Sequence, residues 1–306
     1  MKNLQFKTGC SGAALAKRMS AYDSLHLMAA AGIRNIDFWF HKYGRTETDP
    51  LFCEDWKEWT QRLCTALQEN GQTVTQAHAP TIMKIPRDFH YESPLPMFHR
   101  CIEACAMLGC QTLIFHPVFY KGRIPDRETH DAIMAYNIRW FRELAPVLNS
   151  FGVTGLLENT FDFGCYQQEG DPPFFFTTAE DMLALLDGAR ADNYALCLDT
   201  GHANLAGQDL PDMVRRLGSA LQALHLNDNT GINTGPSADV HLFPGEGTIS
   251  WDSVFSALRE IGFSAIYNME PVADLALLDS KQIISRLNTA QNRLQHLLRL
   301  AENRKD

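Results

Sequence analysis

The stretch LQALHLNDNTGINTGPSADVHLFPGEG, at residues 221–247, decides how the rest of this sequence is interpreted. It begins with a short apolar run, Leu221 to Leu226, which has the length of a buried parallel strand and carries His225 near its end. A glycine-rich segment follows and leads to Asp239 and His241. Histidine and carboxylate side chains this close in sequence are suited to metal binding or to acid–base chemistry.

Short apolar runs of the same kind occur along the whole chain and alternate with helical patterns. We predict eight strands, at residues 4–8, 35–40, 73–79, 112–116, 153–158, 194–199, 221–226 and 265–270. We predict eight helices between and after them, at residues 22–31, 56–70, 96–108, 129–151, 178–189, 210–217, 251–261 and 275–299. Several of these helical patterns end at a glycine, as helices commonly do.

Eight strand–helix units of this length predict a single (β/α)8 TIM barrel, and we expect one domain over residues 1–306. An open, doubly wound sheet is the alternative. Such a sheet commonly carries a G-x-G-x-x-G fingerprint after its first strand, and the nearest approach here, Gly9-Cys10-Ser11-Gly12, does not fit it. No repeat, linker or low-complexity tract divides the sequence.

The composition favours small-molecule chemistry in the cytoplasm. A formal net charge of -9 predicts no attraction to nucleic acid or to an anionic membrane surface. The sequence has no run of eighteen apolar residues and no signal-peptide pattern at its start, so we expect no membrane association. The eight cysteines lack paired CxxC motifs and are interpreted as reduced core thiols.

Six of the predicted strands have a histidine or an acidic residue as their last or second-last residue. These residues are His78, His116, Glu158, Asp199, His225 and Glu270. In a parallel barrel the carboxyl ends of all strands meet at the rim that holds active sites. Taken singly, each of these side chains could be a helix cap or a satisfied buried polar group. Six together would repel one another without a cation, so the sequence predicts a metal site.

Three further residues extend this predicted site. His202 follows the sixth strand by a few residues, and Asp239 and His241 are two residues apart in the loop after the seventh. Mixed histidine and carboxylate ligands suit manganese or zinc better than calcium or an all-oxygen magnesium site. The sequence contains no P-loop, no G-x-S-x-G nucleophile elbow and no H-E-x-x-H helix.

The motifs around these residues resemble those of the xylose isomerase-like TIM-barrel superfamily. They are Leu157-Glu158-Asn159, Leu198-Asp199-Thr200-Gly201-His202, His225-Leu226-Asn227-Asp228, Asp239-Val240-His241 with Pro244-Gly245-Glu246-Gly247, and Met269-Glu270-Pro271. The resemblance covers the chain from about the third predicted strand onward. That superfamily holds sugar isomerases and epimerases, and also the endonuclease IV-type AP endonucleases.

The resemblance to the ketose 3-epimerase branch implies one divalent metal ion bound by Glu158, Asp199, His225 and Glu270. Manganese is the expected ion, with zinc, cobalt or magnesium as alternatives. The same branch implies that Glu158 and Glu270 are the catalytic acid–base pair, which transfers a proton at a carbon next to a metal-bound carbonyl. It also implies that His202 binds the substrate. We therefore expect a sugar or sugar phosphate isomerase or epimerase.

Two positions differ from the epimerase pattern. Residues 229–237 contain no arginine where that branch uses one, and Gly164 stands where it uses a second glutamate. The endonuclease branch offers the alternative, a zinc phosphodiesterase. The resemblance to that branch implies nine ligands for three zinc ions, and this sequence has a suitable residue at each position. These residues are His78, His116, Glu158, Asp199, His202, His225, Asp239, His241 and Glu270.

The loop residues favour the sugar enzyme. An AP endonuclease needs lysines and arginines to hold the phosphates of bent DNA, and the predicted rim loops offer only scattered ones. Aromatic residues at 38–40 and 161–163 could instead pack on a sugar ring. His78, His116, His202, Asp239 and His241 are then substrate ligands or additional metal ligands. The expected partner is a small sugar, and a homo-oligomer is left open.

Overall fold

Eight parallel strands form one continuous sheet that closes on itself. The computed structural model describes residues 6–81, 84–93, 95–189, 192–272, 275 and 277–303. The strands are β1 (Thr8–Ser11), β2 (Asn35–Trp39), β3 (Thr73–His78), β4 (Thr112–Phe115), β5 (Thr154–Glu158), β6 (Tyr194–Asp199), β7 (Leu221–His225) and β8 (Tyr267–Met269). Their order in the sheet is β7-β6-β5-β4-β3-β2-β1-β8.

The two ends of this order, β7 and β8, meet through backbone hydrogen bonds. The amide of Leu226 donates to the carbonyl of Asn268 at 2.8 Å, and the amide of Glu270 donates to the carbonyl of Leu226 at 3.1 Å. These bonds join the last two strands and complete the ring. The predicted (β/α)8 TIM barrel is therefore confirmed.

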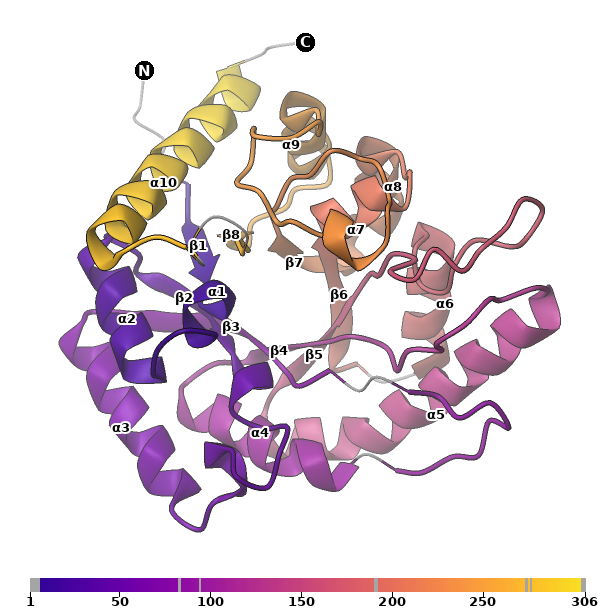
Figure 1. Ribbon diagram of the computed structural model, residues 1–306, viewed down its shortest axis with the longest axis horizontal. Coiled ribbons are helices and arrows are strands. Elements are labelled where there is room, and N and C mark those ends of the chain that lie inside the picture. Colours follow the sequence, from indigo (N-terminus) through magenta and orange to yellow (C-terminus); the bar gives the residue numbers. More distant parts are fainter. Residues whose placement is uncertain are drawn as a thin grey trace.

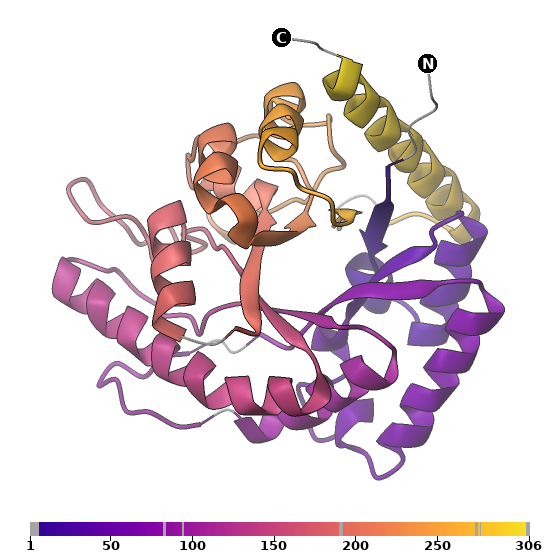
Figure 2. The ribbon, with the colours of Figure 1, turned by 180° about the vertical axis from the view of Figure 1, so that it is seen from behind.

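Helices surround the ring of strands (Figures 1 and 2). The longer ones are α2 (Ala21–Ala30), α3 (Trp56–Glu69), α4 (Leu95–Met107), α5 (Arg127–Phe151), α6 (Ala179–Ala189), α8 (Leu210–Leu217), α9 (Trp251–Glu260) and α10 (Ser280–Asn303). Two short helices, α1 (Ala13–Ala16) and α7 (Thr200–Leu205), follow β1 and β6 directly. The 3-10 turns are η1 (Phe40–Lys42), η2 (Pro50–Phe52), η3 (Gly218–Ala220) and η4 (Pro236–Ala238).

Most predicted elements lie where the sequence placed them, and β1 is the strand that differs most from its predicted range. The sequence predicted this strand at residues 4–8, whereas β1 begins at Thr8 and pairs through Gly9 with Asn35 of β2. The apolar Phe6 misled the prediction, because β1 is short and polar. Residues 4 and 5 of the predicted strand lie outside the described residues.

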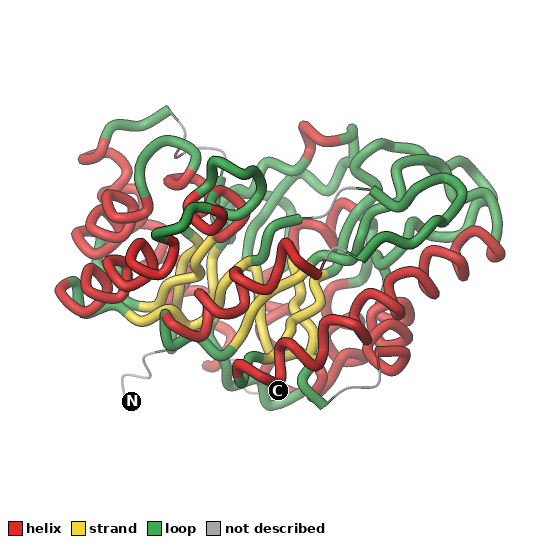
Figure 3. The backbone as a smooth tube through the Cα atoms, turned by 90° about the horizontal axis from the view of Figure 1, so that it is seen from below, coloured by secondary structure: helices red, strands yellow, loops and turns green. Residues whose placement is uncertain are grey.

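The interior of the barrel is filled by small and branched side chains below the rim. Ile114, Leu156, Ala195, Cys197 and Ala223 form one buried cluster contributed by β4 to β7. Strand side chains alternate between the two faces of a sheet, so the residue two positions after an inward-facing one also faces inward. This alternation places the last residues of the strands over the cluster, at the rim where the long loops gather (Figure 3).

The described residues contain no helix that is both long enough and apolar enough to cross a membrane.

The outer face of β5 gives a test of the packing between the sheet and the helices. A Cβ atom added at Gly155 would lie 3.0 Å from Leu148 and would overlap the ring of Tyr194. We expect Gly155→Ala to lower the free energy of unfolding by about 1–3 kcal/mol, because overpacking a filled core is destabilising. Urea denaturation measures this change.

Gly12→Ala is the matched control, because its added Cβ would have no neighbour closer than 3.8 Å. Its unfolding free energy should stay within about 0.5 kcal/mol of the wild type. Equal losses in the two variants would contradict the proposed crowding at Gly155.

Candidate metal centre and active site

Four side chains meet at the carboxyl ends of four strands. Glu158 ends β5, Asp199 ends β6, His225 ends β7, and Glu270 directly follows β8. Each offers one ligand atom, and these four atoms all lie within 4.8 Å of one another. All four residues are buried. The structure therefore brings the four sequence-predicted metal ligands together.

His225 lies in the middle of this group. Its Nδ1 is 2.5 Å from Oε1 of Glu158 and 3.3 Å from Oε2 of Glu270. Burial alone would lower the pKa of His225, but the carboxylates of Glu158 and Glu270 hold it well above its usual range. The electrostatics of the site thus favour positive charge at this point, which is where a divalent cation would be held.

The two glutamates have opposite pKa shifts. Burial alone would raise the pKa of Glu158, but His225 and His116 hold it well below its usual range. Burial raises the pKa of Glu270 to about 7, even though His225 and His241 pull it down. Two carboxyl groups of the same site thus differ in their affinity for a proton.

A second group of possible ligands shares Glu158. Nε2 of His78 and Nε2 of His116 lie 3.1 Å and 3.2 Å from Oε2 of Glu158. Burial lowers the pKa of His116 to about 3, against the attraction of Glu158, so its imidazole is neutral at physiological pH. A neutral imidazole can bind a cation or accept a hydrogen bond from a substrate hydroxyl.

A third group shares Asp199 and depends on α7, which the sequence did not predict. Oδ1 of Asp199 accepts a hydrogen bond from the amide of His202 at 2.7 Å and so caps α7. This turn directs His202 back over the rim, where its Nε2 is 3.7 Å from Asp239. His241 lies 3.0 Å from Asp239. All nine residues predicted for the site therefore lie around one rim.

The loop after β7 is held in place by a buried carboxylate, Asp228. Its two oxygens accept hydrogen bonds from the amides of Asn229, Gly245 and Ile249 and from the indole of Trp251, at 2.8–3.2 Å. This returns the loop to the end of β7. There Nδ1 of His241 is 2.9 Å from the carbonyl of Glu270.

One buried acidic residue in contact with the site was not predicted from the sequence. Asp37 is in the middle of β2, is fully buried, and has its Oδ2 2.8 Å from Nε2 of His225. The signal in the sequence was a lone acidic residue within an otherwise uncharged strand, NIDFW. A charge in such a position requires a partner, and the sequence alone does not show which one.

A cavity of about 270 Å³ lies beside the metal-ligand groups. It is lined by His116, Phe119, Thr160, Phe161, Phe163, His202, Pro236 and Asp239. The aromatic residues of 161–163 thus lie at the cavity, as the sequence predicted, whereas Phe38 and Phe40 are buried in the core. The cavity has one acidic, two imidazole and three phenyl side chains, a combination that suits a ligand with both hydroxyl groups and C–H faces.

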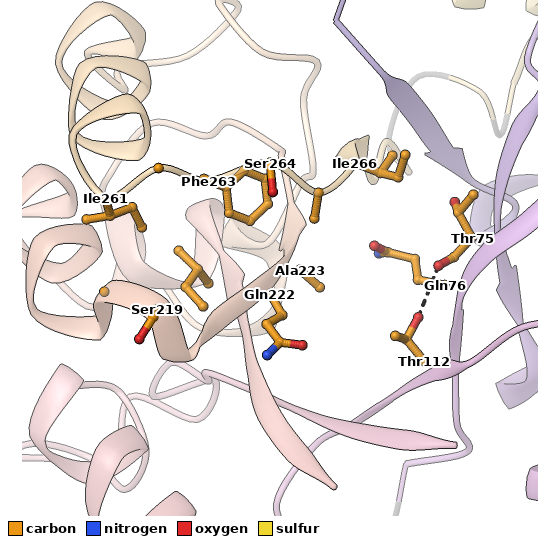
Figure 4. Close-up of a pocket in the computed structure, with 14 residues that line it drawn as sticks. Thr75, Gln76, Thr112, Ser219, Gln222, Ala223, Ile261, Phe263, Ser264 and Ile266 are labelled. Carbon is orange, nitrogen blue, oxygen red and sulfur yellow. Dashed lines mark hydrogen bonds between the residues drawn. The ribbon is translucent and has the colours of Figure 1, made fainter. Parts of the chain in front are cut away.

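A larger cavity, of about 450 Å³, lies at the opposite end of the barrel (Figure 4). The start of β7, part of β3 and the segment before β8 line it, and its side chains are uncharged, as for Thr75, Gln76 and Gln222. It holds no group that could act as an acid, a base or a strong metal ligand. The reactive side chains are all at the other rim.

The comparison with known proteins agrees with the barrel fold. A family model described as a xylose isomerase-like TIM barrel matches residues 25–297. Inosose isomerase from Bacillus subtilis (strain 168) is 26% identical over 174 residues, which cover 56% of this chain and 58% of that protein. The first curated relatives are matched over only 58–66% of their own length.

Solved structures of low sequence identity share the fold. A D-psicose 3-epimerase determined in the presence of D-fructose has a TM-score of 0.73 at 16% identity, over 96% of this chain and 99% of that one. The IolI protein with a bound zinc atom has a TM-score of 0.73 at 18% identity, over 96% and 98%. Both likenesses extend over almost the entire barrel.

Because Asp228 accepts hydrogen bonds from several parts of the loop after β7, we expect Asp228→Asn to destabilise that loop. An amide NH2 would replace an oxygen that faces backbone or indole N–H donors, and such a mismatch costs about 1–3 kcal/mol. We expect this loss of stability in urea denaturation, together with faster hydrogen exchange at residues 239–247.

Asp209→Asn is the matched control, because Asp209 caps α8 and asparagine caps helices equally well. Unchanged exchange at residues 239–247 in Asp228→Asn would show that Asp228 does not hold the loop.

Proposed function

We propose that this chain, which belongs to the xylose isomerase-like TIM-barrel family, is a divalent-metal-dependent isomerase or epimerase of sugars. The observation that carries the proposal is the group of Glu158, Asp199, His225 and Glu270 at one rim. The name of its relative, an inosose isomerase, and those of structural neighbours that are sugar epimerases support the same reaction class.

The four residues fit a divalent cation. Three carboxylates and one imidazole are buried together, and this mixed oxygen and nitrogen set suits a borderline metal such as manganese or zinc. We propose manganese first, and the zinc atom of the IolI neighbour supports a divalent ion in general. A cation bound here would polarise a substrate carbonyl and acidify the neighbouring C–H bond.

Glu158 and Glu270 are the proposed acid–base pair. They lie on β5 and after β8, so their carboxylates approach the site from different sides of the ring. One carboxylate removes the proton from the carbon next to the carbonyl. The other, as the carboxylic acid, returns a proton to the opposite face of that carbon, which inverts it. Alternatively the proton goes to the former carbonyl carbon while the hydroxyl proton on the first carbon passes to the former carbonyl oxygen, which moves the carbonyl.

His116 and His202 line the cavity, and we propose that they bind substrate hydroxyl groups. Phe119, Phe161 and Phe163 would pack on the apolar face of the sugar. Among its described lining residues the cavity has no lysine or arginine, and it has Asp239. We therefore propose an unphosphorylated sugar or cyclic polyol ketone.

A zinc phosphodiesterase is the second candidate. It is supported by the convergence of His78, His116, His202, Asp239 and His241 on the four central ligands, which could hold more than one ion. The net charge of -9 disfavours a nucleic acid substrate. Arg123, in the loop after β4, is ion-paired with Asp171.

Proton exchange tests the proposed chemistry directly. The manganese-loaded protein should exchange the C–H proton next to the carbonyl of its substrate with deuterated water, as followed by NMR across a panel of free ketoses and inososes. Glu158→Gln and Glu270→Gln should each slow this exchange by about 10²–10⁴-fold, because each removes one acid–base group.

Glu143→Gln is the control for this experiment, since Glu143 bonds Tyr91 and Ser93 and belongs neither to the ligand groups nor to the cavity lining. Metal content is measured in every variant, so that loss of the cation is separated from loss of the proton acceptor. Wild-type exchange rates in either glutamine variant would refute the acid–base roles.

Removal of the metal should lower the stability of the protein, and adding the metal back should restore it. Chelation should reduce the melting temperature, and manganese at one hundred times its dissociation constant should add about 2.7 kcal/mol to the free energy of unfolding. Elemental analysis should find one divalent ion per chain. Two or three zinc ions per chain, with cleavage of abasic DNA, would favour the phosphodiesterase instead.

The cavity also predicts a preference between substrates. The free sugar should exceed its phosphate ester in kcat/KM by more than about tenfold, because a buried phosphate without a cationic partner costs more than about 1.4 kcal/mol. Paired kinetic assays on the same sugar with and without phosphate measure this ratio. A preference for the phosphate ester would contradict the assignment of an uncharged substrate.

A further inference from the structure

We propose that Asp37 is a positioning residue, which fixes the ring of His225 so that Nδ1 is available to the cation. The proposal rests on the metal site of the proposed function, but it does not depend on which substrate is converted. Asp37 does not face the cavity and is not among its lining residues. Its effect on the reaction would therefore pass through His225.

The position of Asp37 is determined by three strands. Its Oδ2 is 2.8 Å from Nε2 of His225 on β7, 3.1 Å from Nδ2 of Asn268 on β8, and 3.4 Å from Nε2 of Gln76 on β3. The pairing of β2 with β3 skips Thr75 at this point, so that Asp37 lies beside Gln76. A local irregularity of this kind redirects a side chain. Here it places a carboxylate behind His225.

The two nitrogens of His225 face different carboxylates. Nε2 faces Asp37, which is not a proposed metal ligand and can only accept a hydrogen bond, so Nε2 donates its N–H there. Nδ1 faces Glu158 and Glu270, which are proposed ligands, so a cation bound on this side would take the place of a proton on Nδ1. Ligand histidines commonly donate their other N–H to a carboxylate, which fixes the tautomer and raises the basicity of the ligand nitrogen.

A purely structural role explains Asp37 less well. Its Oδ1 is buried and has no hydrogen-bond partner among the described residues. Burial of a carboxylate without full hydrogen bonding is unfavourable, and an uncharged residue would fill the same space at lower cost. The charge is therefore better explained by the cation site, whose ligand histidine it contacts.

The chain provides a matched control. Asp181 is also buried, and its Oδ2 is 2.9 Å from Nε2 of buried His130, between α6 and α5. This second aspartate–histidine pair has the same chemistry as the pair of Asp37 and His225, but it lies outside the candidate site. Removing either carboxylate disturbs a buried pair, whereas only one of the two pairs involves a proposed metal ligand.

The test compares Asp37→Asn with Asp181→Asn by calorimetric titration of the metal-free proteins with manganese, and by the visible spectrum of the cobalt-loaded forms. We expect Asp37→Asn to weaken manganese binding by about 10–100-fold and to change the cobalt spectrum. Asp181→Asn should lower the melting temperature by a similar amount and keep wild-type affinity and spectrum. Equal affinity in the two variants, whether retained or lost, would overturn the proposal.

A measurement on the wild type covers the case in which Asp37→Asn does not fold. In the zinc-loaded, ¹⁵N-labelled protein, long-range ¹⁵N–¹H spectra should show His225 protonated at Nε2 and metal-bound through Nδ1, with His225→Gln used for assignment. A proton on Nδ1 would overturn the proposal.

The two proposals can fail separately. Metal binding without sugar turnover would refute the proposed function and leave Asp37 to be judged by affinity. Turnover with unchanged affinity in Asp37→Asn would refute only the role of Asp37. A wild-type protein that binds no divalent cation would refute both.

Discussion

The repulsion among buried carboxylates at one rim is the constraint on which this structure depends. Glu158, Asp199 and Glu270 are buried within a few ångströms of one another, and Asp37 adds a fourth negative group just below them. Such a cluster is stable only with compensating positive charge. The histidines between these carboxylates supply it when protonated, and a divalent cation would supply it while leaving the imidazoles neutral.

The barrel keeps this charged cluster separate from the apolar core. Three ligands are the last residues of their strands and Glu270 directly follows its strand, and apolar residues such as Leu156 and Ala223 fill the barrel two positions before Glu158 and His225. Other carboxylates hold the loop after β7 in place. Asp228 gathers backbone amides of the loop after β7, and Glu246 in the same loop is ion-paired with Arg286 and Arg293 of α10.

The barrel and all nine residues at its rim could be predicted from the sequence. The ends of the strands converge in a parallel barrel, and histidines and carboxylates at those ends are distinctive. The sequence could not predict the contact of Asp37 with His225. That contact depends on the closure of the ring and on the irregular pairing of β2 with β3 at Thr75. The sequence also missed α7, because a helix capped by the last residue of a strand leaves no separate pattern. The polar β1 was misplaced for lack of an apolar signature.

The closing of the ring between β7 and β8 has a consequence for the order of events during synthesis. His225 ends β7 and Glu270 follows β8, so these two ligands lie on opposite sides of the contact between β7 and β8. This contact can form only after β8 has been synthesised. A chain emerging from the ribosome would have Asp37, Glu158 and Asp199 long before it has Glu270. Capture of a cation by Glu158, Asp199, His225 and Glu270 would therefore mark the completed barrel and would hold β7 and β8 together.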